Sequence, residues 1–434
     1  MTIPLARRAA AACALALAAV IGVGTAAPAA AAGDQWWYDT YQVEKNHADG
    51  WTGEGVKIAV IDEQINPELP VFAGTNLTVA PEALCEGRSA TSTDVATAQH
   101  GSTITALLIG NGEGAAGIRG IVPDAEVTFF GLGPEPEGSE TDTCDPPAEA
   151  GEGVTELGWG IRQAIDAGAD VISMSIGANP EEGDAEIVAE AIARGIVMVA
   201  AVYNGGADFL DTQVYPWGYR GVVAMNAMDQ NGALPIDPDF GIPHIVPGTT
   251  AVAAGVDISV IGHDGDWNAA GVGTGSSFAA PLVAGMIAAT SQKYPEATGN
   301  QLLQSLIRNT GPTDHPLEFS DTDGYGYGLA SFTHMLNVDP TGYEDVNPLL
   351  DKSSRIAGGT EPTDEQLDAA VARVAAEATP APSAEPAAAE DDGGMLSGAI
   401  VAVIVVIVLL VAAAVVTIVI ITRNNRKNRP RSLQ

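Results

Sequence analysis

The amino-acid sequence predicts an α/β domain in which helices cover both faces of a mostly parallel β-sheet. Short apolar runs rich in β-branched residues alternate along the chain with segments whose apolar residues recur at helical spacing. The runs are almost continuously apolar, which is typical of strands buried on both faces in a parallel sheet. Residues 33–340 carry this alternation without an internal repeat, and we expect them to form one large globular domain.

The order of these elements indicates where a site would form. The predicted strands are VKIAVID at 56–62, AEVTFFG at 125–131, DVISMSIG at 170–177, IVMVAAV at 196–202 and RGVVAMNAM at 220–228. The predicted helices are 100–110, 156–169, 184–195, 278–294 and 300–310. In open α/β sheets, ligands bind at the carboxyl ends of the strands. Candidate residues are therefore those that follow a strand or begin a helix.

Both ends of the chain predict segments outside the globular domain. Residues 1–32 combine a basic start, an apolar run and small residues of the A-x-A kind, which is the pattern of a secretory signal peptide. A retained N-terminal anchor is the alternative. Residues 397–422 contain an uncharged apolar run that, as a helix rising ~1.5 Å per residue, would cross the ~30 Å core of a bilayer. A buried core helix is the alternative, but only the basic tail 423–434 follows it.

The basic tail predicts an orientation, because positively charged flanks stay on the cytoplasmic side of a membrane. We therefore expect a single-pass protein of the cell membrane, with its globular domain outside and its C-terminus in the cytoplasm. Residues 341–396 are rich in Ala, Pro and acidic residues and predict an extended linker between the domain and the membrane. Within this linker, residues 363–378 have helical spacing.

Charge and cysteine content narrow the classes of partner. The net charge is −36, and seven of the 19 Lys and Arg residues lie in the signal peptide and the tail, so the exported part is near −43. This excess of acid argues against nucleic acid as a partner. Cys13 leaves with the signal peptide, and Cys85 and Cys144 predict a disulfide in an exported chain, with two free thiols as the alternative. Neither has a C-x-x-C partner or a nearby His, and we predict no metal and no cofactor.

Three residues with complementary chemistry stand at predicted strand ends and helix starts. Asp62 closes the first strand. His100 opens the first helix, and Ser277 lies directly before the helix that begins at Phe278. A serine hydroxyl becomes a nucleophile when an imidazole takes its proton, and a carboxylate orients that imidazole and stabilises its charged form. Each residue alone is also typical of a turn or a cap, so the hypothesis of a catalytic triad depends on the set.

The chain order Asp62, His100, Ser277 and the segments around these residues resemble the subtilisin-like serine protease family. The matching segments are VKIAVID, HGSTITALLIG, GIVPDAEV, DAGADVISMSIG, GSSFAAPLVAG and YGYGLA. Together they cover about residues 50–335. The resemblance implies a subtilisin-like fold and a serine endopeptidase that hydrolyses peptide bonds in protein or peptide substrates.

The resemblance also assigns roles within the site. In the family, a bulky apolar residue, Ala, any residue and Pro follow the nucleophile, and this frame selects Ser277 and leaves Ser276 in a supporting role. Asn204 matches the amide that donates to the oxyanion, together with the backbone N–H of Ser277. Ser175, Ile176 and Gly177 resemble the edge that pairs with an extended substrate.

Three residues depart from the family pattern. Glu63 and Gln64 follow Asp62 where the family has Thr or Ser and then Gly, and Tyr203 precedes Asn204 where the family has Gly. The unusual surroundings of the triad put activity on general protein substrates in doubt.

The whole arrangement, from signal peptide to basic tail, resembles the mycosins, which are membrane-anchored subtilisin-like proteases of type VII secretion systems. Components of a secretion channel are therefore expected partners. Two functions follow: a membrane-anchored endopeptidase, or a subtilisin fold that stabilises a secretion complex with weak or no proteolytic activity. Labelling of the serine by a fluorophosphonate distinguishes them.

Overall fold

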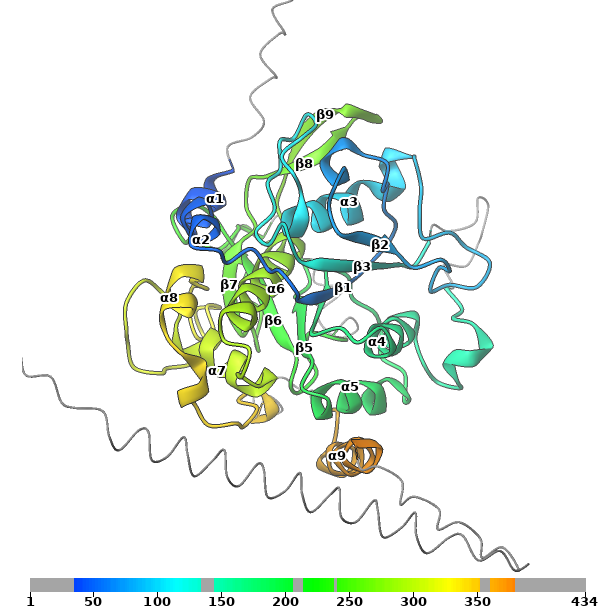
Figure 1. Ribbon diagram of the computed structural model, residues 1–434, viewed down its shortest axis with the longest axis vertical. Helices are drawn as coiled ribbons and strands as arrows, with labels where there is room; N and C mark the ends of the chain where they lie inside the picture. The colour runs from blue at the N-terminus through cyan, green and yellow to red at the C-terminus, as the bar shows by residue number, and fades with distance from the viewer. Residues whose placement is uncertain (1–34, 134–143, 206–213, 238–239, 352–359, 379–434) are drawn as a thin grey trace, which may run out of the picture. The chain divides into compact units, whose positions relative to one another are not determined.

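The computed structural model describes residues 35–133, 144–205, 214–237, 240–351 and 360–378 (Figure 1). The predicted signal peptide, the apolar segment 397–422 and the basic tail lie outside these residues. Within the described ranges, no helix combines the length and the apolar character needed to span a membrane.

Seven parallel strands of the described residues form one sheet, in the order β2-β3-β1-β4-β5-β6-β7. Their bounds are β1 Lys57–Asp62, β2 Leu77–Val79, β3 Glu126–Gly131, β4 Val171–Met174, β5 Val197–Ala201, β6 Val223–Met228 and β7 Ala251–Ala254. The predicted α/β class is confirmed, and so are the five predicted strands. The short strands β2 and β7 were not predicted.

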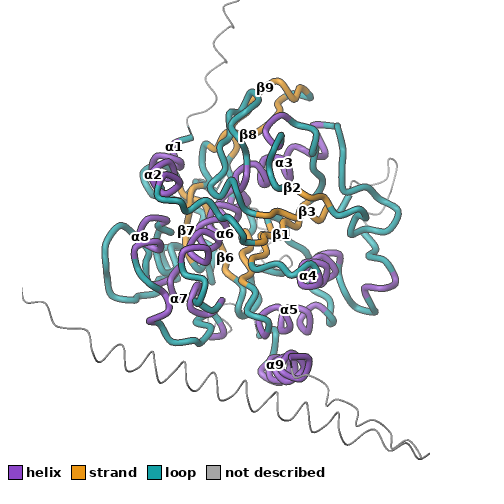
Figure 2. Tube along the Cα trace, viewed as in Figure 1, coloured by secondary structure: helices purple, strands orange, loops and turns teal. Residues whose placement is uncertain are grey.

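Helices cover this sheet on both faces, as Figures 1 and 2 show. The described helices are α1 Trp36–Thr40, α2 Val43–Ala48, α3 Val95–Ile109, α4 Glu156–Asp166, α5 Asp184–Ala193, α6 Ser276–Lys293, α7 Gly299–Arg308, α8 Phe332–Asn337 and α9 Asp364–Ala378. Short 3-10 turns are η1 Pro70–Phe72, η2 Ala148–Ala150 and η3 Pro340–Gly342. An antiparallel hairpin, β8 Ile258–His263 with β9 Asp266–Gly273, precedes α6.

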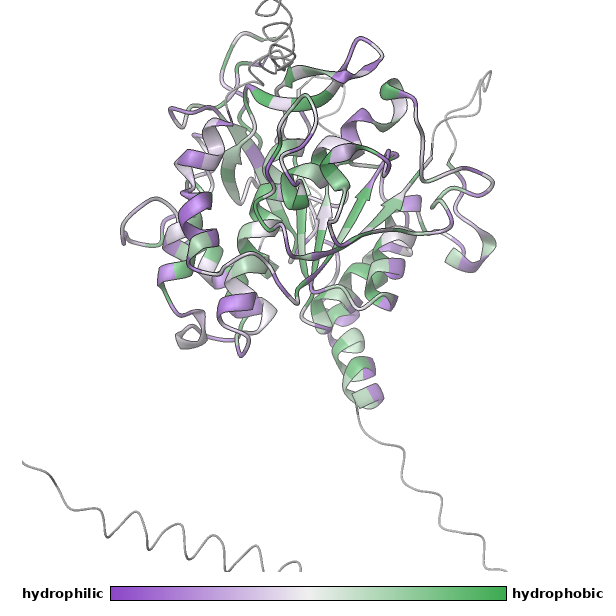
Figure 3. Ribbon diagram, turned by 45° about the horizontal axis from the view of Figure 1, so that its top comes forward, coloured by the Kyte–Doolittle hydropathy of each residue, from purple (hydrophilic) through white to green (hydrophobic). Residues whose placement is uncertain are grey.

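The central strands bury both of their faces. In β1, Ile58 and Val60 pack into the core on the side of α3 and α6, whereas Ala59 and Ile61 pack into the core on the side of α4 and α5. Because side chains alternate along a strand, a strand covered on both sides needs an apolar residue at every position. Figure 3 shows the hydrophobic strands at the centre of the domain. This burial explains the continuous apolar runs in the sequence.

Side-chain caps define where the helices begin. Asp94 caps α3 by accepting a hydrogen bond from the backbone N–H of Ala96 at 3.0 Å, and Thr155 caps α4 in the same way from Gly158 at 3.0 Å. The cap at Asp94 corrects one expectation: α3 begins at Val95, so His100 lies in its second turn and does not open the helix. The first turn was missed because it lacks apolar spacing.

The folded unit extends beyond the expected boundary at residue 340 and ends at Ala378. Residues 341–351 pack on the domain, with Leu349 2% exposed, and α9 packs on α5, next to which it lies in Figures 1 and 2. Arg373 of α9 binds Glu190 of α5 at 3.0 Å, and Arg194 binds Glu377 at 2.6 Å. The predicted helix within 363–378 is therefore correct, but its description as part of an extended linker was wrong.

Candidate active site

The residues expected to do chemistry gather at the carboxyl ends of neighbouring strands. Asp62 is the last residue of β1 and lies in register with Gly131 at the end of β3. Ser175 directly follows β4, which pairs with β1, and Asn204 follows the end of the next strand, β5. Ser277 is the second residue of α6, which packs against β4 and β5. The parallel sheet thus brings segments that are distant in sequence to one edge.

Asp62 and His100 form a direct hydrogen bond. The distance between Nδ1 of His100 and Oδ1 of Asp62 is 2.7 Å, and because a carboxylate only accepts, Nδ1 carries the proton. Asp62 is fully buried, whereas the side chain of His100 is 31% exposed. The backbone N–H of Glu63 also donates to Oδ1 of Asp62 at 2.8 Å. This arrangement leaves Nε2 of the neutral imidazole without a proton and able to accept one.

The surroundings of His100 favour its charged form. Burial lowers the pKa of His100, but the charge and the hydrogen bond of Asp62, together with the nearby charge of Glu63, outweigh burial and raise the pKa above its usual value. The pKa of Glu63 is itself raised, by burial and by the charge of Asp62, while His100 acts in the opposite direction. Glu63 therefore interacts electrostatically with the acid–base pair, and its side chain is only partly desolvated because it remains in contact with solvent.

The two adjacent serines have different environments. Ser276 is fully buried, and its hydroxyl lies within hydrogen-bond distance of the Val202 carbonyl and of Oδ1 of Asn204. The hydroxyl of Ser277 makes no hydrogen bond within the described residues, while its backbone carbonyl accepts one from Ser175 at 2.7 Å. Ser276 is committed to internal contacts, which favours Ser277 as the residue that meets a substrate.

Asn204 is held with its amide nitrogen toward Ser277. Its Oδ1 accepts the backbone N–H of Ser276 at 2.7 Å, which identifies the oxygen end of the amide, and lies 2.8 Å from the hydroxyl of Ser276. A Cβ atom placed on Gly275 would lie 3.1 Å from Oγ of Ser277 and 3.3 Å from Nδ2 of Asn204. The hydroxyl and the amide nitrogen therefore face the same space beside Gly275, which its lack of a side chain leaves open.

The described residues form no hydrogen bond between the imidazole of His100 and the hydroxyl of Ser277. Their helices, α3 and α6, pack against each other, and α6 also contacts β1. Catalytic hydrogen bonds are often long in the absence of substrate and tighten in the Michaelis complex. The geometry therefore brings together an oriented acid–base pair and a hydroxyl beside an amide donor.

The residues that depart from the family pattern fit into the structure in different ways. Gln64 is buried, and its Nε2 donates to the backbone carbonyls of Ser89 at 2.7 Å and Thr91 at 3.1 Å. The ring of Tyr203 packs edge-on to His244, with centroids 5.2 Å apart. The main consequence of these departures concerns Asp62. Its Oδ2 is buried and has no hydrogen-bond partner in the part of the chain that the structure describes.

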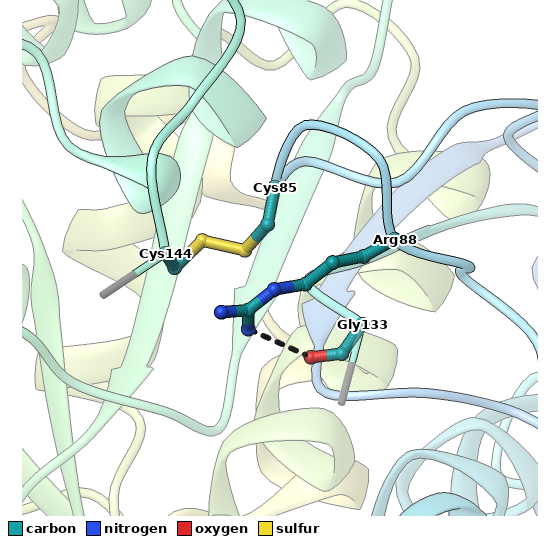
Figure 4. The surroundings of a disulfide bond; sticks show 4 residues. All are labelled: Cys85, Arg88, Gly133 and Cys144. Carbon is teal, nitrogen blue, oxygen red and sulfur yellow. Dashed lines mark hydrogen bonds between the residues drawn. A yellow bond between two sulfur atoms is a disulfide. The ribbon is translucent and has the colours of Figure 1, made fainter. Parts of the chain in front are cut away.

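A cleft of about 1190 Å³ is lined by the residues that directly follow Asp62 and Ser175 in the chain, although the triad residues themselves do not line it. Ile176 and Gly177, from the edge expected to pair with a substrate, line it, together with Glu63. Cys85 and Cys144, whose Cα atoms are 5.2 Å apart, form a disulfide at its wall (Figure 4), so the expectation of a disulfide agrees with the structure. The sequence does not predict this cleft, because no motif marks its remaining lining residues.

Comparisons with known proteins agree with this geometry. Subtilisin Savinase from Lederbergia lenta is 29% identical over 300 residues, which are 68% of this chain and 96% of that protein. An alkaline protease from Alkalihalobacillus alcalophilus is 29% identical over 300 residues, 68% of each chain. The structure of MycP1 from Mycobacterium smegmatis is similar in fold, with a TM-score of 0.54 and 20% identity, over 74% of this chain and 88% of that one.

The sequence profile of the subtilase family, Peptidase_S8, matches residues 53–328, which is more than half of the chain. The match includes all three members of the expected triad and the fold described above. The chain therefore belongs to the subtilase family of serine endopeptidases.

Proposed function

We propose that this protein is a membrane-anchored extracellular endopeptidase that hydrolyses peptide bonds with Asp62, His100 and Ser277. The observation that carries the proposal is the 2.7 Å hydrogen bond between His100 and a fully buried Asp62, at the strand edge where Ser277 lies in the first turn of α6. Oriented imidazole, buried carboxylate and a serine with an unengaged hydroxyl are the parts of a nucleophilic triad.

In the proposed reaction, Nε2 of His100 removes the proton of Ser277 as Oγ attacks the carbonyl carbon of the scissile bond. Asp62 holds the proton on Nδ1 and stabilises the imidazolium that forms. The backbone N–H of Ser277 and Nδ2 of Asn204 donate to the developing oxyanion. His100 then gives its proton to the leaving amine, and water, deprotonated by the same imidazole, releases the acyl group from Ser277.

A fluorophosphonate probe tests the proposal, because it reacts with a serine that an imidazole activates. We expect the purified full-length protein to be labelled at one site and Ser277→Ala to abolish the label. Ser276→Ala is the matched control and should keep the label, since its hydroxyl is buried. Peptide mapping by mass spectrometry identifies the labelled residue. Label on Ser276, or none on a protein that is folded by circular dichroism, would contradict the proposed function.

Two observations favour a second function. Oδ2 of Asp62, which is buried without a hydrogen-bond partner among the described residues, and the charge of Glu63 are unfavourable for an efficient triad. They support a role as a stabilising component of a secretion complex with weak or no proteolytic activity. The fold of MycP1, described as an essential component of the type VII (ESX-1) secretion system, supports an association of this chain with such a system. Absence of labelling in folded protein would favour this alternative.

The proposed anchoring predicts a topology. Protease added to intact cells should release the globular domain by cutting in the Pro- and Ala-rich segment that follows α9. A tag placed after Gln434 should survive in the membrane fraction, because the tail 423–434 lies in the cytoplasm. Immunoblots against the globular domain and against the C-terminal tag measure the outcome. Permeabilised cells are the control, and they should lose the tag. A tag that is degraded in intact cells would contradict the proposed orientation.

The charge of Glu63 predicts a shift in the pH dependence of activity. Because Glu63 raises the pKa of His100, and a general base must be neutral, the neutral fraction of His100 falls as the pH drops through that pKa. We expect Glu63→Gln to lower the pKa, to move the acidic limb of the kcat/KM profile to lower pH and to raise the rate below neutral pH. Glu68→Gln, an exposed neighbour on the same loop, is the control. Superimposable profiles of Glu63→Gln and wild type would show that Glu63 does not tune the base.

A further inference from the structure

The cleft of about 1190 Å³ is continuous with the expected substrate edge. The hydroxyl of Ser175 donates to the backbone carbonyl of Ser277 at 2.7 Å, so this edge begins directly at the nucleophile. The next residues of the edge, Ile176 and Gly177, line the cleft, and Glu63 lines it from the end of β1. A peptide that lies along the edge while Ser277 attacks it therefore places one or more of its side chains in this cleft.

The lining of the cleft has an excess of negative charge. Its described acidic residues are Glu63, Asp145, Glu156 and Glu181, and its one described basic residue is Arg88. The guanidinium of Arg88 donates to the backbone carbonyl of Gly133 at 3.5 Å, beside the disulfide (Figure 4). Among the described residues, no three acidic, His or Cys side chains are grouped closely enough to hold a metal ion. The acidic groups are thus spaced along the cleft and do not form a metal site.

Gln64 adds an acceptor for which the described residues supply no donor. Its side chain lines the cleft and is 2% exposed, and both N–H groups of its amide are used by the carbonyls of Ser89 and Thr91. These two acceptors fix the orientation of the amide, because only its nitrogen can donate to them. Its Oε1 is buried and has no hydrogen-bond partner within the described ranges. A buried acceptor in this state is unfavourable, and an N–H donor from a bound substrate would stabilise it.

We propose that the cleft binds a positively charged side chain of the substrate, and that this protease selects Lys or Arg at a position near the scissile bond. An ammonium or guanidinium group supplies both the charge that the carboxylates favour and the donors that Oε1 of Gln64 lacks. Acidic side chains at the same position meet like charges and are rejected. The inference rests on the proposed function, since it takes the substrate to lie along the edge that begins at Ser175.

Binding to Ser277→Ala tests the inference without any need for cleavage. The full-length variant in detergent is titrated with fluorescent peptides of one uncharged sequence in which Lys, Arg, Gln or Glu is placed at each position in turn. At one or two positions we expect Lys and Arg peptides to bind about tenfold more tightly than the Glu peptide, and the ratio to shrink in high salt. Equal dissociation constants at every position, or no measurable binding of any peptide, would overturn the inference.

Charge-removing variants locate the effect. Glu181→Gln and Glu63→Gln, each combined with Ser277→Ala, should reduce the ratio of the dissociation constants of the Glu and Lys peptides several-fold. Glu126→Gln is the matched control, because this exposed carboxylate lies at the start of β3, the opposite end of the strands, and should leave the ratio unchanged. An unchanged ratio in both cleft variants would overturn the assignment to this cleft.

The same protein separates this inference from the proposed function. If wild type is labelled at Ser277 but peptides bind without regard to charge, the peptidase assignment stands and the charged cleft is refuted. If wild type is never labelled but Lys peptides bind preferentially to the cleft, the cleft stands and the chain is a peptide-binding component. The pH effect of Glu63 on His100 acts on all peptides alike and cancels in a ratio of dissociation constants.

Discussion

Asp62→Asn should lower kcat/KM for a peptide substrate by roughly 10⁴-fold while KM changes little. In wild type, Oδ1 of Asp62 accepts the proton on Nδ1 of His100, which leaves Nε2 free to take the proton of Ser277. An asparagine can turn its amide N–H toward the ring and so favour the tautomer that is protonated on Nε2. That imidazole has no lone pair directed at Ser277 and cannot act as its base.

The burial of Asp62 makes a folding control necessary. We expect the thermal midpoint of Asp62→Asn to stay near that of wild type, because asparagine keeps the volume of this fully buried side chain and removes a buried negative charge. Asp94→Asn is the matched control: it lies at the N-cap of the helix that carries His100, and asparagine caps a helix as well as aspartate. Activity within a few-fold of wild type in a folded Asp62→Asn protein would show that Asp62 does not orient the base.

The residues of the proposed triad could be selected from the sequence alone. Asp62 and Ser277 stand at the end and the start of elements that hydrophobic patterns define, and His100 lies in the second turn of another such element. The order of the three residues along the chain is restrictive. Side chains alternate along a strand, so a strand that is buried on both faces needs a continuous apolar run, and such runs predict the parallel sheet. In β1, for example, Ile58 and Ile61 lie on opposite sides of the sheet. Periodicity and chemistry are both local properties of the chain, which is why the sequence predicts them.

Features that depend on contacts between distant segments were not predictable. The packing of α9 on α5 depends on Arg373 and Glu190, which are 183 residues apart, and composition alone favoured an extended linker there. The buried amide of Gln64 depends on how the loop at Ser89 and Thr91 folds against it. Neither contact has a periodicity or a motif, so only the folded structure reveals it.

Asn204→Ala should lower kcat by about 10²–10³-fold with little change in KM, the loss found when an oxyanion-hole amide is removed from a protease of this family. The reason is that Nδ2 of Asn204 faces the space beside Gly275 that Ser277 also faces, and its hydrogen bond strengthens as charge develops on the substrate oxygen. Steady-state kinetics on one peptide measure both parameters. A loss confined to KM would mean that Asn204 binds the substrate in its ground state.

The hydroxyl of Ser276 provides a sharper test of the same site, because it acts on the oxyanion only through Asn204. It holds Oδ1 of Asn204 at 2.8 Å, while the backbone N–H of Ser276 holds the same atom at 2.7 Å and remains in Ser276→Ala. Ser276→Ala should therefore lower kcat less than Asn204→Ala does. Added to Asn204→Ala, it should lower kcat no further, since the amide that it positions is gone. Losses that multiply in the double variant would show that Ser276 supports catalysis by a route independent of Asn204.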